Sequence, residues 1–211
     1  MSRRDEGRKE RISKNISPRG EEWYFYSEGK ETEPNYLKSL FENVDKNKES
    51  INPIIEGLGM VSLSLVNDVI EKDNKIVKDH KTFVLFDKDD NPNMNFNFAI
   101  DKAKQNNIIP LWSNECFELW LLLHFNYMDS NISRNDYYEK LKDLTKSKKY
   151  EKNMDNIFDE VNGINGALKA YKNAKKLYKT YKNKPYKDMA PCTTVFELID
   201  EINKVINVLK K

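Results

Sequence analysis

Short apolar runs alternate with segments of helical periodicity through residues 21–127, and this alternation restricts the fold more than any other feature. The clearest run, residues 82–86 (TFVLF), is continuously apolar and rich in residues that favour strands. Similar runs occupy residues 23–27, 51–55 and 108–112. Strands separated by helices form βαβ units. We therefore expect an α/β fold in which a mainly parallel four-stranded sheet is flanked by helices.

The same pattern divides the chain into three regions. Residues 1–20 mix both signs of charge without apolar periodicity, which is typical of a basic, flexible arm. Residues 21–127 hold the alternating strands and helices, and residues 128–211 form a helical C-terminal region. This last region has two apolar stripes, in residues 167–181 and 195–209. Each stripe either closes the protein's own core or offers a docking surface to a partner.

Composition restricts the class of protein further. The formal net charge is +2 over 211 residues, so total charge does not indicate a nucleic-acid binder and the local distribution must decide. Cys116 and Cys192 are far apart, which fits a reducing compartment rather than a disulfide framework. The first residues lack the apolar core of a signal peptide, and the most apolar stretch, residues 116–125, is too short to span a bilayer. We expect a cytoplasmic protein without membrane contact.

Acidic residues follow three of the predicted strands. Glu28 follows the first strand, Asp87, Asp89 and Asp90 follow the third, and Glu115 and Glu118 come shortly after the fourth. In an open α/β sheet, ligands bind beyond the carboxyl ends of the strands, so these side chains are expected at one edge. Mg²⁺ prefers carboxylate oxygens and keeps several of its waters. The pattern therefore predicts an Mg²⁺ or Mn²⁺ site at that edge.

Each of these acids also has a simpler interpretation. Carboxylates in loops are usually just solvated, and residues 87–93 (DKDDNPN) have an ordinary turn composition. Glu118 differs because it begins a helix that is apolar nearly all round, where an unpaired carboxylate is costly. It needs a partner or a metal, and a backbone amide would also satisfy it. His124 at the end of that helix is expected to be a packed, hydrogen-bonded core histidine.

Lysines supply candidate contacts to a phosphate. Lys30 and Lys88 stand beside the acidic residues, and Lys175 and Lys176 lie in a stretch rich in lysine and tyrosine. Lysine can neutralise a phosphate, and tyrosine can stack on an unpaired base. Within this stretch, residues 134–188, Tyr171, Tyr178 and Tyr181 also fall on an apolar helical stripe. Packing of the tyrosines, with the lysines on the wet face, is therefore the alternative.

Four motifs in order along the chain carry a resemblance to known families. They are EGKETEPNYL at 28–37, FDKDD at 86–90, NECFELWLLLHF at 114–125 and PCTTVFELI at 191–199. Together they resemble the RloB-like proteins, which are also seen as the second component of the AbiL abortive-infection system. The strand before Glu28 and the later DxD pair look like the Toprim domain of topoisomerases, bacterial primases and OLD-type nucleases.

The resemblance implies roles for individual residues. Glu28, Asp87 and Asp89 would be both the metal ligands and the catalytic carboxylates of a Toprim-like domain spanning residues 21–127. The metal would be Mg²⁺ or Mn²⁺, and the chemistry would be phosphoryl transfer. The family likeness also implies a defence role beside an ABC-type ATPase.

Other acidic residues would support that site. Glu118 would be a further catalytic acid, whereas Glu33 and Asp90 would lie behind the ligands and position them. Two departures limit the analogy. The chain lacks the active-site tyrosine context of a topoisomerase and the template-binding or zinc module of a primase, which argues against strand passage and nucleotidyl transfer.

The leading interpretation is an endonuclease effector of anti-phage defence that cuts a backbone phosphate in DNA or RNA, tRNA included. The sequence has no GxxxxGK[ST] loop for binding a nucleotide itself. Control is therefore expected from a partner, such as an ATPase encoded nearby, or from homo-oligomerisation. The alternative is a non-catalytic, metal-binding regulatory subunit of an ATPase complex.

Overall fold

The computed structural model describes residues 20–46, 49–89, 92–181 and 183–208. Apart from Gly20, the arm expected over residues 1–20 lies outside the described residues, as does Asp90. The regular elements follow one another in the order β1 (Glu21–Ser27), α1 (Thr32–Val44), β2 (Ile51–Gly57), α2 (Ser62–Asp73), β3 (His80–Asp87), α3 (Asn93–Gln105), β4 (Ile109–Asn114), α4 (Glu118–Leu123), α5 (Arg134–Leu144), α6 (Ile157–Glu160), α7 (Gly163–Lys179), the 3-10 turn η1 (Tyr186–Asp188), β5 (Cys192–Thr193) and α8 (Phe196–Val205).

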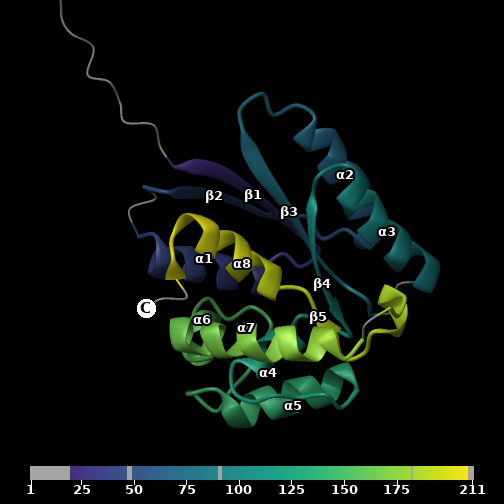
Figure 1. The fold of residues 1–211 in the computed structure, drawn as a ribbon. Coiled ribbons are helices and arrows are strands. Elements are labelled where there is room, and N and C mark those ends of the chain that lie inside the picture. The colour runs from purple at the N-terminus through teal and green to yellow at the C-terminus, as the bar shows by residue number, and fades with distance from the viewer. Residues whose placement is uncertain (1–19, 47–48, 90–91, 182, 209–211) are drawn as a thin grey trace, which may run out of the picture.

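The sheet has five strands in the order β2-β1-β3-β4-β5 (Figure 1). The first four strands pair in parallel, which confirms the expected α/β class. The expected count of four is wrong, because β5 adds a short antiparallel edge in which Thr193 pairs with Ser113 and Cys192 with Asn114. A strand of two residues is too short to display the alternation by which strands are found in a sequence. The sheet is therefore mixed, and its last strand comes from the C-terminal region.

Helices cover both faces of the sheet. Figure 1 shows α2 and α3 on one side and α1, α7 and α8 on the other. Along β3 the side chains alternate accordingly, because Val84 and Phe86 join the core under α2 and α3 while Phe83 and Leu85 join the opposite core. Burial on both faces explains why this strand is continuously apolar. No described helix is long and apolar enough to cross a membrane.

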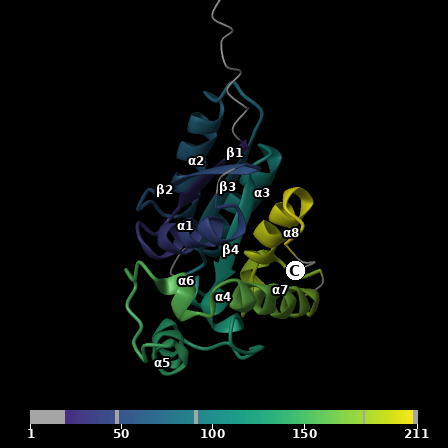
Figure 2. The ribbon, with the colours of Figure 1, turned by 90° about the vertical axis from the view of Figure 1, so that its left-hand side faces the viewer.

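The apolar stripes of the C-terminal region close the protein's own core. The buried side chains of α7 and α8 are Ala167, Ala170, Ala174, Leu177, Phe196, Leu198, Ile199 and Ile202. They pack in one cluster with β1, β3, α1 and α4. In Figure 2, α4, α5, α6 and α7 gather at the end of the molecule away from α2. Most of the described stripe residues are thus used internally, although Val205 stays 39% exposed.

Helix α4 is held in place by a buried histidine and by close contact with α7. The hydroxyl of Tyr36 lies 3.0 Å from Nε2 of His124, and Nδ1 of His124 lies 2.9 Å from the carbonyl oxygen of Val161. Because a carbonyl can only accept, Nδ1–H donates and Nε2 accepts from the tyrosine. Burial lowers the pKa of His124 to about 3, so the ring is neutral. His124 is the satisfied core histidine that the sequence predicts.

We predict that Gly166→Ala destabilises the fold through the contact between α4 and α7. A Cβ at this position would lie 2.1 Å from the carbonyl oxygen of Val161 and 2.6 Å from Nδ1 of His124. Overpacking of this kind typically costs about 1–3 kcal/mol. Urea denaturation should show the loss, whereas Asn165→Ala, on an exposed position of the same helix, should leave stability nearly unchanged. Equal stability of the two variants would contradict this account of α7 packing.

Candidate active site

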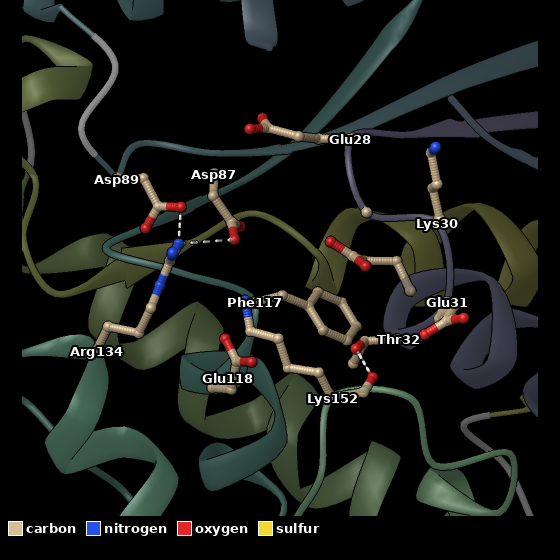
Figure 3. A pocket seen from close by; sticks show the side chains of 12 residues that line it. Glu28, Lys30, Glu31, Thr32, Asp87, Asp89, Phe117, Glu118, Arg134 and Lys152 are labelled. Carbon is tan, nitrogen blue, oxygen red and sulfur yellow. Dashed lines mark hydrogen bonds and ion pairs between the residues drawn. The ribbon is translucent and has the colours of Figure 1, made fainter. Parts of the chain in front are cut away.

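A cavity of about 300 Å³ lies at the carboxyl ends of β1 and β3. It combines acidic side chains from the α/β region with cations from the C-terminal region (Figure 3). Its lining consists of Glu28, Gly29, Lys30, Glu31, Thr32, Glu33, Asp87, Asp89, Phe117, Glu118, Arg134 and Lys152. The structure therefore brings Glu28, Asp87, Asp89, Glu118 and Glu33 to one place.

The loop after β1 positions Glu28 and Glu33. The backbone N–H of Glu28 donates to the carbonyl oxygen of Leu85 at 2.9 Å, which extends the sheet pairing by one residue. A Cβ at Gly29 would lie 2.1 Å from a carboxylate oxygen of Glu33, so a side chain there would displace that carboxylate. The absence of a side chain at Gly29 thus lets Glu33, on the first turn of α1, fold back toward the cavity.

The loop after β3 positions the DxD pair. Lys88 and Asp89 donate their backbone N–H groups to the carbonyl oxygens of Ser113 at 2.8 Å and Glu115 at 3.1 Å. Asp89 has a φ of 35°, so the backbone turns here rather than continuing extended. Both carboxylates nevertheless face one cation, Arg134. The turn, and not strand alternation, brings the two aspartates to the same side.

The carboxylates raise one another's pKa values. Burial, followed by the charges of Glu118 and Glu28, raises the pKa of Glu33 to about 7. Burial and the charges of Glu33, Glu118 and Glu28 raise the pKa of Asp87 well above its usual range. Burial also raises the pKa of Glu28. Such clusters of perturbed acids in a cleft are common at functional sites.

Glu118 has the partner that its burial requires. It is only 4% exposed at the start of α4, and the hydroxyl of Tyr150 donates to its Oε1 at 2.7 Å. A carboxylate that accepts a hydrogen bond from a buried hydroxyl is held in one orientation. Tyr150 belongs to the lysine- and tyrosine-rich stretch, but it acts here on the carboxylate.

Two cations of the cavity were not among the site residues predicted from the sequence. Arg134, the first residue of α5, forms an ion pair with Asp89 and its Nη2 lies 3.9 Å from Oδ2 of Asp87. Lys152 lines the cavity from the segment between α5 and α6, where its carbonyl oxygen accepts a hydrogen bond from the hydroxyl of Thr32. Neither residue stands in a motif with the acids. The one local signal is the capping box formed by Ser133 and Asp136, which marks the helix start beside Arg134.

The four lysines expected to bind substrate separate into two groups. Lys30 lines the cavity, and Lys88 lies next to it with its Nζ 3.2 Å from the carbonyl oxygen of Asp89. Lys175 pairs with Asp200 at 3.0 Å, and Lys176 lies 3.9 Å from the centre of the Tyr127 ring. Lys175 and Lys176 thus contact α8 and the segment after α4 rather than the cavity.

The side chains of the cavity are of the types that bind a hard divalent cation, but they are not yet grouped around a single point. Among the described residues Oε2 of Glu28 is buried without a hydrogen-bond partner, and carboxylate oxygens are the donors that Mg²⁺ and Mn²⁺ prefer. Within the part of the chain that the structure describes, no three histidine, cysteine or acidic side chains are already grouped to hold a metal ion. Mg²⁺ needs only one or two protein carboxylates because it keeps its waters. Glu28, Asp87 and Asp89 would be the residues that hold it.

A family model described as RloB-like protein matches residues 24–202. No curated protein and no solved structure matches the chain. The matched segment contains every residue that lines the cavity.

We predict that the metal-free protein loses stability as the pH rises from about 4.5 to about 7, through Glu33. Below pH 4.5 Glu33 is protonated in both the folded and the unfolded state. Between its ordinary pKa of 4.5 and the folded value of about 7, only the unfolded state ionises. The free energy of unfolding should therefore fall with rising pH, by up to about 3 kcal/mol at 1.36 kcal/mol per pKa unit.

Urea denaturation in chelator at several pH values measures this slope. Glu33→Gln should flatten it in part, because Asp87 and Glu28 shift in the same direction. Glu71→Gln, at an exposed position of α2, should keep the parental slope. An unchanged slope in Glu33→Gln would rule out Glu33 as the source.

Proposed function

The chain belongs to the RloB-like family, and on that premise we propose that it is an Mg²⁺- or Mn²⁺-dependent endonuclease with a Toprim-like catalytic region. The observation that carries the proposal is the cavity in which Glu28, Asp87 and Asp89 meet at the carboxyl edge of the parallel strands. Acids crowded together at such an edge are costly to the fold without a ligand. Divalent cations relieve that cost, and phosphodiester cleavage is the chemistry they most often serve there.

A bound Mg²⁺ would supply charge that stabilises the phosphate undergoing attack. Protein groups would do the remaining work. Glu33, with a pKa of about 7, is divided between its two forms near neutral pH and can give or take a proton. Tyr150 donates to Oε1 of Glu118 and so orients a further carboxylate that lines the same cavity.

Nucleic acid is the proposed substrate, with DNA and RNA, tRNA included, both open. Cations on the cavity wall favour a polyanion despite the acidic floor, since Lys30, Arg134 and Lys152 all line it. The family likeness supports a role as effector of an anti-phage or abortive-infection system with an ABC-type ATPase encoded nearby. Co-expression of both genes and purification on the ATPase tests this partnership, and no recovery of the chain would count against it.

A second function is favoured by one observation. Arg134 already pairs with Asp89 and lies beside Asp87, so one of the two charges of the DxD pair is compensated without a metal. Such a site is compatible with a non-catalytic regulatory subunit of an ATPase complex. Divalent-metal-dependent cleavage of assorted nucleic acids, with and without the ATPase, separates the two functions.

We predict that Glu28→Gln and Asp87→Asn each lower metal-dependent cleavage by about 10²-fold or more, because each removes a ligand charge. Both variants should keep the parental circular dichroism spectrum, and their metal-free forms should be at least as stable, since each relieves like-charge repulsion. Glu71→Gln is the matched control, a glutamate exposed on α2. Parental cleavage by both site variants would refute this site, whereas no cleavage by the parent under any condition would favour the regulatory subunit.

A further inference from the structure

Arg134 is placed in the cavity by an ordered helix start. Ser133 caps α5 and forms a capping box with Asp136, and the buried residues Tyr137 and Leu141 fix the helix against the core. The side chain of Arg134 is 32% exposed. Its guanidinium can therefore move while its backbone stays in position.

The contacts of this guanidinium are incomplete. It pairs with Asp89 and lies 3.9 Å from Asp87, and Figure 3 shows it pointing from α5 at both carboxylates. Its Nε is buried with no hydrogen-bond partner among the described residues. A guanidinium offers five donors in a fixed fork that matches carboxylate and phosphate equally well. The observed pairing leaves part of that fork unused.

A second cation points into the same space. Figure 3 shows Lys152 extending toward Phe117 from the side opposite Arg134. The exposed Lys152 is tethered through its backbone to Thr32, beside the acidic loop. Arg134 and Lys152 thus reach the mouth of the acidic site from two segments of the C-terminal region.

We propose that Arg134 is an exchangeable counter-ion, displaced from Asp87 and Asp89 by a divalent cation and then bound, together with Lys152, to a substrate phosphate. The inference rests on the proposed function. It follows because one pair of carboxylates cannot hold a guanidinium and a divalent cation in the same place. A displaced guanidinium beside Lys152 is suited to a phosphate, which arginine binds through two parallel hydrogen bonds. Metal binding would thereby prepare the site for its substrate.

Calorimetric titration of the full-length chain with Ca²⁺, a cation chosen to allow binding without cleavage, tests the exchange. Arg134→Gln should bind Ca²⁺ about tenfold more tightly than the parent, because no internal cation competes for the carboxylates. Lys140→Gln is the matched control, since Lys140 is an exposed cation on the same helix and outside the cavity. Its affinity for Ca²⁺ should remain parental. Equal Ca²⁺ binding by the parent and Arg134→Gln would overturn the exchange and leave the metal site standing.

Binding of a phosphorothioate single-stranded oligonucleotide in Ca²⁺ tests the phosphate contact. Arg134→Gln should lose about tenfold in affinity, the effect expected for one charge-assisted contact, and Lys140→Gln should lose little. Arg134→Lys, which keeps the charge and therefore the fold, should lie near the parent in Ca²⁺ affinity but below it for the oligonucleotide. Unchanged oligonucleotide binding in Arg134→Gln and Arg134→Lys would overturn the phosphate role. No Ca²⁺ binding by the parent or by Arg134→Gln would overturn both the exchange and the metal site of the proposed function.

Discussion

Mutual repulsion among buried carboxylates is the constraint around which this molecule is arranged. Glu28, Glu33, Asp87, Asp89 and Glu118 share one cavity, and burial raises the pKa values of Glu28, Glu33 and Asp87. A carboxylate in such surroundings must be protonated, paired with a cation or hydrogen-bonded. All three solutions are present, since Glu33 takes up a proton near neutral pH, Asp89 pairs with Arg134 and Glu118 accepts from Tyr150.

The partners of these acids explain why the C-terminal region is part of the same structure. Arg134, Tyr150 and Lys152 all come from the segment between α4 and α6, and that segment is tied to α1. The side-chain amide of Asn35 donates to a carboxylate oxygen of Asp155 at 3.1 Å, next to the bond between Thr32 and Lys152. The end of the chain then returns to the sheet as β5. The sequence pattern therefore changes near residue 127, but the hydrophobic core and the cavity contain residues from both sides of that boundary.

The sequence was enough to predict what local pattern encodes. Strand β3, buried on both faces, leaves a continuous apolar run, and shorter apolar runs mark β1, β2 and β4. The first four strands and the shared edge beyond β1 and β3 could therefore be predicted from the sequence. Local sequence patterns gave no indication of features that depend on contacts between residues far apart in the chain. Strand β5 exists because Cys192 and Thr193 meet β4, and Arg134 matters because a helix start lies opposite Asp89. Lysine-rich composition pointed instead to Lys175 and Lys176, whose partners, Asp200 and the Tyr127 ring, lie outside the cavity.

The compensating cation also bears on the choice between the two proposed functions. A purely structural ion pair gains most when its donors are fully used, because burying a charge without its hydrogen bonds is costly. Arg134 is part-exposed, and neither its Nε nor Oε2 of Glu28 across the cavity has a hydrogen-bond partner within the described part of the chain. These two atoms therefore keep unused hydrogen-bonding capacity, although Arg134 pairs with Asp89 and the Glu28 carboxylate accepts a backbone hydrogen bond from Asp87. They are what a site needs if each group receives its partner, a cation for Glu28 and an anion for Arg134, only when ligands arrive.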